Sequence, residues 1–469
     1  KYFCTPKQIN KLNKMNISSS AKIDLKSSVL IIFSLIFSFS AISQTTDSSV
    51  NNLKVQIQFR PKLEVRDGAF RPLAKKEEPA VLVSERIRLN INYSYKNIFT
   101  LKISPQTVGI WGQANAVQGV ENSGNKIALF EAWTNFNLSN TWNIKLGRQV
   151  ISLDDERFFG ELDWAQGGRT HDALSFLYKK NNVNVKSYFA FNQNYKSLYN
   201  NNSYNPAGNL YNSNDAVPYK TMQTLWVGFN ANAISTFSFL FTNIGLQQAA
   251  NLNNTNAAVH QSQTFGINYF NAGKTTFGNL SAYWQTGKNI AGTKTQAFLL
   301  AGSIGYKFSN KTKIMVGTDW VSGNDIGQAK PPTTNNAFTP YFHTGHKFYG
   351  NMDYYFAGNG HQNAGLSDSY LNLQCTPTKK LNATIAVHQF YTTNKISSQL
   401  KNYSKNLGQE LDFSLQYKPN SFTSLSCGYS FYVTTPTIHY LKNTTGSKDY
   451  QQWLWLSLNV TPTLLISKF

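Results

Sequence analysis

The chain has 469 residues, of which 14% are aromatic and only 14% are charged, and its formal net charge is +21. No stretch reaches the run of about 18 apolar residues that a membrane-spanning helix needs, and no sustained helical or heptad pattern is present. The composition therefore argues against a helical membrane protein and a coiled coil. It favours one large β-structure over two or three ordinary soluble domains.

The N-terminal part of the chain is predicted to be a targeting segment, residues 1–43. Lys22 and Lys26 precede the apolar run 29–37, and Ala41-Ile42-Ser43 offers small residues before a cleavage point. This order is typical of a secretory signal peptide, and the apolar run is too short for a membrane anchor. Met15 is the expected start, which makes residues 1–14 an upstream extension, and residues 44–52 form a short lead-in.

Removal of the targeting segment would leave 38 basic and 22 acidic residues, a net charge of +16. Such an excess predicts an anionic partner. The candidates are outer-membrane lipid and lipopolysaccharide, or an acidic solute. Other outer-membrane proteins are possible partners, whereas export argues against nucleic acid.

Alternation of apolar and polar residues begins at residue 53, which marks the start of the main predicted unit, residues 53–469. Apolar residues occupy every second position from Leu53 to Val65, and charged or amide side chains fill the positions between them. Residues 86–95 and 99–103 repeat this pattern. Because successive side chains of a strand point to opposite sides, each segment has one apolar face and one polar face.

Short and long connections alternate along the chain. Short turns are expected near residues 96–97, 139–140, 181–182, 234–235, 272–273, 310–311, 377–378 and 419–420. Longer polar stretches cover residues 151–168, 194–219, 247–260, 322–367 and 394–405. Eight turns join sixteen strands, and a further strand at each end gives about eighteen. This sorting of lengths predicts an all-β, transmembrane antiparallel barrel with short periplasmic turns, long extracellular loops and both termini periplasmic.

A barrel of this size must be closed and cannot be filled by its wall. Unpaired backbone groups are costly in hydrocarbon, so a sheet spans a membrane only when it has no free edge. Eighteen strands enclose a lumen too wide for wall side chains to fill. The lumen is therefore expected to contain water, inserted loops or both.

Two blocks of motifs carry a family resemblance. The first comprises Leu146-Gly147-Arg148-Gln149, Asp154 to Gly160, Leu162-Asp163-Trp164, and Gly168 to Leu174; the second comprises residues 319–325, 346–354 and 365–368. Together they resemble the alginate-export family of outer-membrane porins, in which a G-R-Q turn leads to an E-R-x-x-G loop and a G-R-x-x-D-A-L strand. The resemblance spans about residues 53–460. It implies an eighteen-stranded barrel with a cationic pore that passes an acidic polysaccharide.

Basic residues are the candidates for contact with a solute. Those predicted to line the pore are Lys54, Arg60, Arg86, Arg88, Lys102, Lys145, Arg148, Arg157 and Arg169. Rows of Arg and Lys lower the barrier to a polyanion, and Arg can hold a carboxylate in bidentate fashion. Arg148 has the same parity as Leu146, so either Gly147 marks a bulge or Arg148 lies beyond the lipid-facing band.

The same charges have a structural interpretation. Wide barrels balance Arg in the lumen against acids that brace the wall, and Asp155, Glu156, Asp163 and Asp172 are available for that role. Bracing and solute contact both remain open for each arginine.

Catalytic and metal-binding interpretations are weaker. His171, Asp172 and Ser175 supply base, acid and hydroxyl, but adjacent strand residues face opposite sides, so no triad forms unaided and no enzyme is predicted. His343, His346 and His361 share a long stretch with Asp353, yet their spacing matches no strong metal signature. No metal or cofactor is predicted.

Two functions remain open from the sequence. The first is a porin-like channel that passes anionic solutes, such as acidic oligo- or polysaccharides, through a basic lumen. The second is a plugged barrel that serves as a structural or interaction subunit of a larger outer-membrane complex.

Overall fold

The structure is a computed structural model that describes residues 50–68, 70–112, 127–193, 219–248, 258–328, 332–355, 360–444 and 448–469. The predicted targeting segment lies outside the described residues, as do most of the lead-in and most of the predicted loop 194–219.

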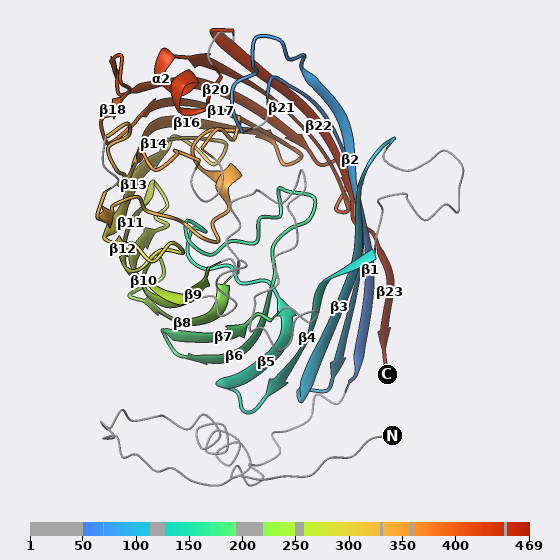
Figure 1. Cartoon of the computed structure of the whole chain (residues 1–469). Helices are drawn as coiled ribbons and strands as arrows, with labels where there is room; N and C mark the ends of the chain where they lie inside the picture. The colour runs from blue at the N-terminus through green and yellow to red at the C-terminus, as the bar shows by residue number, and fades with distance from the viewer. Residues whose placement is uncertain are drawn as a thin grey trace, which may run out of the picture. The chain divides into compact units, whose positions relative to one another are not determined.

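Within these described ranges, eighteen antiparallel strands close into a barrel (Figure 1). In chain order they are β1 (Asn52–Arg66), β2 (Ala80–Tyr95), β3 (Phe99–Ile110), β4 (Ile127–Asn137), β5 (Trp142–Gln149), β6 (His171–Lys180), β7 (Val183–Phe191), β8 (Tyr219–Asn230), β9 (Ser235–Gln247), β10 (Val259–Asn271), β11 (Thr276–Gly287), β13 (Ala297–Lys307), β14 (Thr312–Val321), β16 (Leu366–Thr378), β17 (Leu381–Tyr391), β20 (Asn406–Tyr417), β21 (Thr423–Thr434), and β22 (Tyr450–Val460) with its continuation β23 (Thr463–Lys468). The predicted fold class and strand number are confirmed.

The barrel closes between its first and last strands. β1 pairs with β2 on one side and with both β22 and β23 on the other. Pro462 separates β22 from β23, because a proline has no N–H to give to the ladder. Small elements lie in the connections: the pairs β12 (Lys294–Thr295) with β15 (Thr334–Asn335) and β18 (Ile396–Ser397) with β19 (Asn402–Tyr403), the 3-10 turn η2 (Gly345–Lys347) and helix α2 (Pro436–Leu441).

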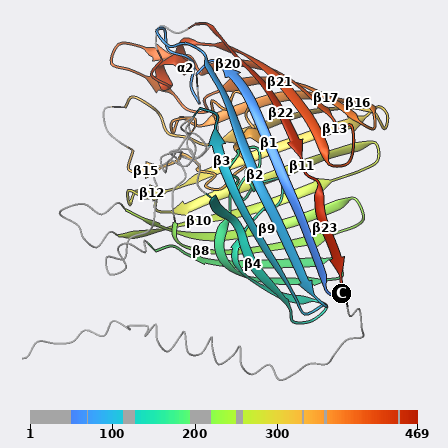
Figure 2. The same cartoon turned by 90° about the vertical axis from the view of Figure 1, so that its right-hand side faces the viewer.

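The predicted alternation of short and long connections is confirmed. All eight predicted turns occur, although β16 extends through the predicted break at 377–378 and the chain turns at 379–380. Long connections at 67–79, 111–126, 288–296 and 435–449 were not predicted. Asn51 and Phe469 exchange backbone hydrogen bonds of 2.8 and 3.1 Å, so both described ends lie on the short-turn side (Figure 2).

The outward face of the wall is apolar in its middle. Ile267, Leu280 and Ile304 are each more than 60% exposed there. Toward the long loops this band ends at a row of amides, in which Asn243 donates to Gln223 and accepts from Gln263, both at 2.7 Å. Among the described residues, no helix is long and apolar enough to cross a membrane.

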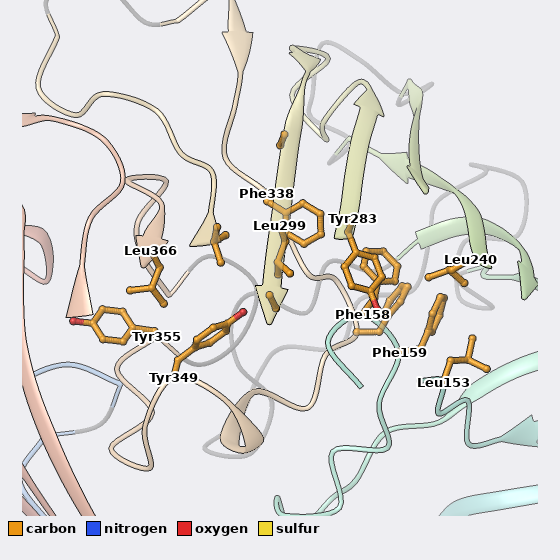
Figure 3. Close-up of a cluster of buried hydrophobic side chains, with 14 of the residues drawn as sticks. Leu153, Phe158, Phe159, Leu240, Tyr283, Leu299, Phe338, Tyr349, Tyr355 and Leu366 are labelled. Carbon is orange, nitrogen blue, oxygen red and sulfur yellow. The ribbon is translucent and has the colours of Figure 1, made fainter. Parts of the chain in front are cut away.

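The buried core lies inside the barrel. Two connections that fold into the lumen contribute to it: the first inner loop (residues 150–170) and the second inner loop (residues 322–365, of which 322–328, 332–355 and 360–365 are described) (Figure 1). Figure 3 shows Phe158 of the first inner loop beside Tyr283 of β11 and Phe338 of the second inner loop, with ring centroids 6.1 and 6.5 Å apart. Aromatic contacts of this kind contribute about 0.5–1.5 kcal/mol each beyond the area that they bury.

Candidate functional site

Three arginines of the wall meet one carboxylate of the first inner loop. Arg86 of β2 donates from Nη1 to Oδ1 of Asp163 at 2.8 Å. Arg88 of β2 and Arg60 of β1 approach the same carboxylate at 3.5 and 3.6 Å. All three face inward because they alternate with outward apolar residues such as Ile87, which is 37% exposed.

The same arginines fix the backbone of that loop. Arg60 donates to the carbonyl oxygens of Asp163 and Ala165 at 2.7 and 2.9 Å, and Arg86 donates to that of Gln166 at 3.2 Å. Gln166 completes the contact by donating from Nε2 to the carbonyl oxygen of Arg60 at 3.1 Å. These bonds dock the first inner loop against β1 and β2, as the bracing interpretation requires.

Positive charge nevertheless remains in excess at this point. Three guanidinium groups share one carboxylate, and Nε and Nη2 of Arg86 and Nη2 of Arg88 are buried with no acceptor among the described residues. Leaving a buried donor unsatisfied costs about 1–3 kcal/mol, more for a charged group. Burial alone would raise the pKa of Asp163, but Arg86 and Arg60 outweigh it and lower that pKa. A second anion near the cluster would offset this excess charge.

A second basic group follows along β3 to β5. Lys102 forms an ion pair with Glu131 of β4, which also accepts from Nε1 of Trp133 at 2.8 Å. Lys145 places its Nζ 3.9 Å from the centre of the Trp133 ring. Lys54, near the short-turn end of β1, belongs to the same inward face by strand parity.

Arg157 and Arg169, the two motif arginines that lie in or next to the first inner loop, form contacts that hold this loop to other parts of the lumen. Arg157 is 3% exposed and lies between Asp155 and Asp319 of β14, with N–O distances of 2.6 and 2.7 Å. Arg169 donates to the carbonyl oxygen of His343 at 2.7 Å and so joins the two inner loops. Glu156 faces Lys347 of the second inner loop at 3.7 Å.

The predicted positions of Arg148, as a pore-lining residue, and of Asp172, as a bracing acid of the lumen, are wrong. They form a bidentate ion pair on the outward face, with distances of 2.8 and 2.9 Å and side-chain exposures of 43% and 60%. The reason is strand parity. Gln149, which follows Arg148 on β5, and His171, which precedes Asp172 on β6, point inward and are buried, so Arg148 and Asp172 point outward. Arg148 therefore does not line the pore, and Asp172 does not brace the lumen.

Sequence reasoning missed several residues of the site. Lys62 pairs with Glu64 at 3.2 Å and lies 4.6 Å from the ring of Trp164, which stacks on His346 at 3.9 Å. Lys62 could have been found, since it belongs to the charged face of the first alternating segment. Asp154 stands in the first motif block, but its partners could not have been found: it accepts from Trp226 and Asn268, both at 3.0 Å, on strands far away in sequence.

The residues considered for catalysis do not assemble, and of those considered for metal binding the structure pairs His346 with Asp353 at 2.9 Å. Asp172 faces outward, whereas His171 and Ser175 face inward, where they contact Tyr219 and Gln149 at 3.1 and 2.8 Å. No group of three His, Cys, Asp or Glu side chains within the described ranges has the arrangement of a metal site.

These features define a class: a transmembrane β-barrel of the outer-membrane porin type, with loops folded into its lumen. The alginate export family matches residues 51–448, and the chain belongs to that family. No curated protein matches the chain significantly.

Several solved structures share the fold at low sequence identity. OccK5 (OpdH) of Pseudomonas aeruginosa superposes with a TM-score of 0.59 at 12% identity, over 88% of this chain and 98% of that one. OpdL of the same organism gives 0.58 at 10% identity, over 88% and 99%. OccAB1 of Acinetobacter baumannii gives 0.56 at 13% identity, over 88% and 97%.

Proposed function

We propose that this protein is an outer-membrane channel that passes anionic solutes, with acidic oligo- or polysaccharides as the substrate class. The observation that carries the proposal is the cluster of Arg60, Arg86 and Arg88 around the single carboxylate of Asp163. Three guanidinium groups around one carboxylate leave an excess of positive charge in this part of the lumen, which would attract a passing carboxylate. Family membership supports the polysaccharide class.

The inward lysines extend this charge along the wall. Lys102 pairs with Glu131, and Lys145 lies over the ring of Trp133, which donates to the same carboxylate, so two ammonium groups lie near one acid. Several weak sites in a row allow an anion to enter and to leave, which conduction requires. We also propose that the short turns and both ends of the barrel face the periplasm, after export by the segment 1–43.

Reversal potential across a planar bilayer under a KCl gradient tests the proposal. The wild-type channel is expected to prefer chloride over potassium. The double variant Arg86→Gln/Arg88→Gln should lower that preference, whereas Arg148→Gln, on the outward face, should leave it unchanged. Cation preference in the wild type would overturn the proposal.

One observation favours the second function, a plugged structural barrel. Phe158, Phe159 and Phe342 pack together in the lumen, with Phe159 and Phe342 stacked at 5.1 Å. A lumen sealed by such packing would carry no current. Absence of single-channel steps from reconstituted, heat-modifiable protein would favour this function over transport.

A further inference from the structure

Charges on the inward face are divided between two parts of the wall. Strands β1 to β8 carry the basic residues Lys54, Arg60, Lys62, Arg66, Arg86, Arg88, Lys102, Lys145, Lys186 and Lys220, against the acids Glu64 and Glu131. Strands β14 to β20 carry the acids Asp319, Asp368, Glu410 and Asp412, all at most 3% exposed. The inward lysines Lys307 and Lys313 lie beside the ring of Phe277, near the short turns.

A cavity of about 590 Å³ adjoins the acidic strands. It extends from residues 346–351 of the second inner loop to Ala272 in the turn between β10 and β11, so it lies on the short-turn side of that loop. Its charged lining comprises Asp155, Arg157, Asp319, His346, Lys347, Asp368, His388 and Asp412.

Negative charge is in excess in this cavity. Arg157 is shared by Asp155 and Asp319, and His388 is shared by Asp368 at 3.0 Å and Asp412 at 3.9 Å. Two cationic groups thus face four carboxylates even when the histidine is protonated.

The other charged lining residues do not remove this excess. Lys347 is half exposed and is directed to Glu156, and His346 is hydrogen-bonded to Asp353 at 2.9 Å. Oδ2 of Asp319 is buried and has no hydrogen-bond partner among the described residues. A cationic group entering the cavity would meet an unsatisfied carboxylate oxygen.

The chemistry of the lining favours an organic cation. No metal-ligand arrangement occurs in the described part of the chain, and the volume falls within the range of about 300–1,000 Å³ typical of small-molecule sites. An ammonium group offers three donors to carboxylates and carries the matching charge. A uniform polyanion would instead be repelled by Asp319, Asp368 and Asp412.

We propose that this cavity is a subsite for the ammonium group of the solute, so that the preferred solutes are amino-substituted sugar acids. The inference rests on the proposed function, because the acidic group of the same solute would be recognised by the basic strands. Glu410 and Asp412 also accept from the backbone N–H groups of Met352 and Asn351 at 2.7 and 3.3 Å. A purely loop-holding role for these acids is therefore the alternative that the experiment must separate.

Proteoliposome swelling tests this proposal with three matched solutes, which are glucitol, gluconate and 2-amino-2-deoxygluconate. The last two differ only in one hydroxyl replaced by an ammonium group. Wild-type proteoliposomes should swell about five times faster in 2-amino-2-deoxygluconate than in gluconate. This ratio of rates corresponds to the free energy of one solvated ion pair. Asp368→Asn and Asp412→Asn should each bring this ratio toward one, whereas Asp172→Asn, on the outward face, should not.

The outcomes separate the two proposals. Gluconate no faster than glucitol would overturn the proposed function. Gluconate faster than glucitol, but equal to its amino derivative, would leave the channel function intact and overturn the subsite. A wild-type preference that survives in both Asp variants would assign these acids to loop holding alone, and the wild-type comparison stands even if a variant fails to fold.

Discussion

Arg157 of the first inner loop donates from Nη2 to Oδ1 of Asp319 on β14 at 2.7 Å, and both side chains are at most 3% exposed. Asp155 binds the same guanidinium at 2.6 Å, and the ring of Phe348 covers it at 4.2 Å. The pair therefore joins a loop that starts at β5 to the distant part of the wall. The loop crosses the lumen and limits its width.

Replacement of Arg157 by alanine should release the first inner loop without unfolding the barrel. Removing one member of a buried pair costs roughly 3–5 kcal/mol, because the other charge is left uncompensated. Proteolysis of residues 150–170 should become faster and single-channel conductance should rise, with heat-modifiable migration unchanged. Arg71→Ala breaks the exposed pair with Glu77 and serves as the control. Unchanged proteolysis would show that the pair does not hold the loop.

Replacement of Asp163 by asparagine should increase anion preference. It removes the carboxylate that three arginines share, while the amide keeps one acceptor for Arg86. The chloride-to-potassium permeability ratio should rise about two- to threefold, as removal of an interaction of roughly 0.5 kcal/mol implies. Reversal potentials measure this ratio, and a fall in it would contradict the assignment of these arginines to the conducting path.

The pH dependence of the Asp163 contact has a definite sign. Because the arginines lower the pKa of this carboxyl despite its burial, its contribution to loop docking is complete above the ordinary aspartate pKa. That contribution is lost only as the pH falls through the lowered pKa. Titration of Asp163 should therefore leave the chloride-to-potassium permeability ratio of the wild type unchanged as the pH falls to the ordinary pKa of aspartate.

His361 of the second inner loop should make that loop sensitive to mild acid. Burial lowers its pKa from 6.5 to about 4, and its Nδ1 accepts from the N–H of Gly365 at 3.1 Å. Between pH 6.5 and about pH 4, His361 binds more protons in the unfolded loop than in the folded loop. The stability of the folded loop therefore falls as the pH drops from 6.5 to about 4. The full shift corresponds to about 3 kcal/mol.

Hydrogen exchange of residues 360–365, corrected for the intrinsic rate at each pH, measures this effect. Protection should decrease on acidification in the wild type and should vary less in His361→Gln. Equal pH dependence in both proteins would exclude His361 as its source.

The wall could be predicted from the sequence because its signals are local. Period-two alternation set the faces of residues 53–66 and 86–95, and turn residues such as Asn181 and Asn182 marked the hairpins. Side chains that meet across the barrel have no such signal. Arg157 and Asp319 are 162 residues apart, and nothing in either segment indicates that they are partners.

Arg148 shows how two sequence signals can conflict. Its strand parity indicated the outward face, whereas its place in the family motif suggested the lumen. The structure follows parity, because one strand cannot reverse its alternation without a bulge, and Gly147 stays in register with Ala173 and Trp133. Motif membership alone did not determine orientation.

Two substitutions on β10 should locate the edge of the apolar band. Ile267 is 63% exposed in its middle, and Gln263 lies four residues away on the same face, in the amide row. In a bilayer, Ile267→Lys should cost about 2–4 kcal/mol of unfolding free energy and Gln263→Lys about 0–1 kcal/mol, because the penalty for a cation falls with distance from the midplane. Denaturant unfolding of the two variants in lipid vesicles measures the difference. Equal costs would mean that the membrane does not end at the row of Gln223, Asn243 and Gln263.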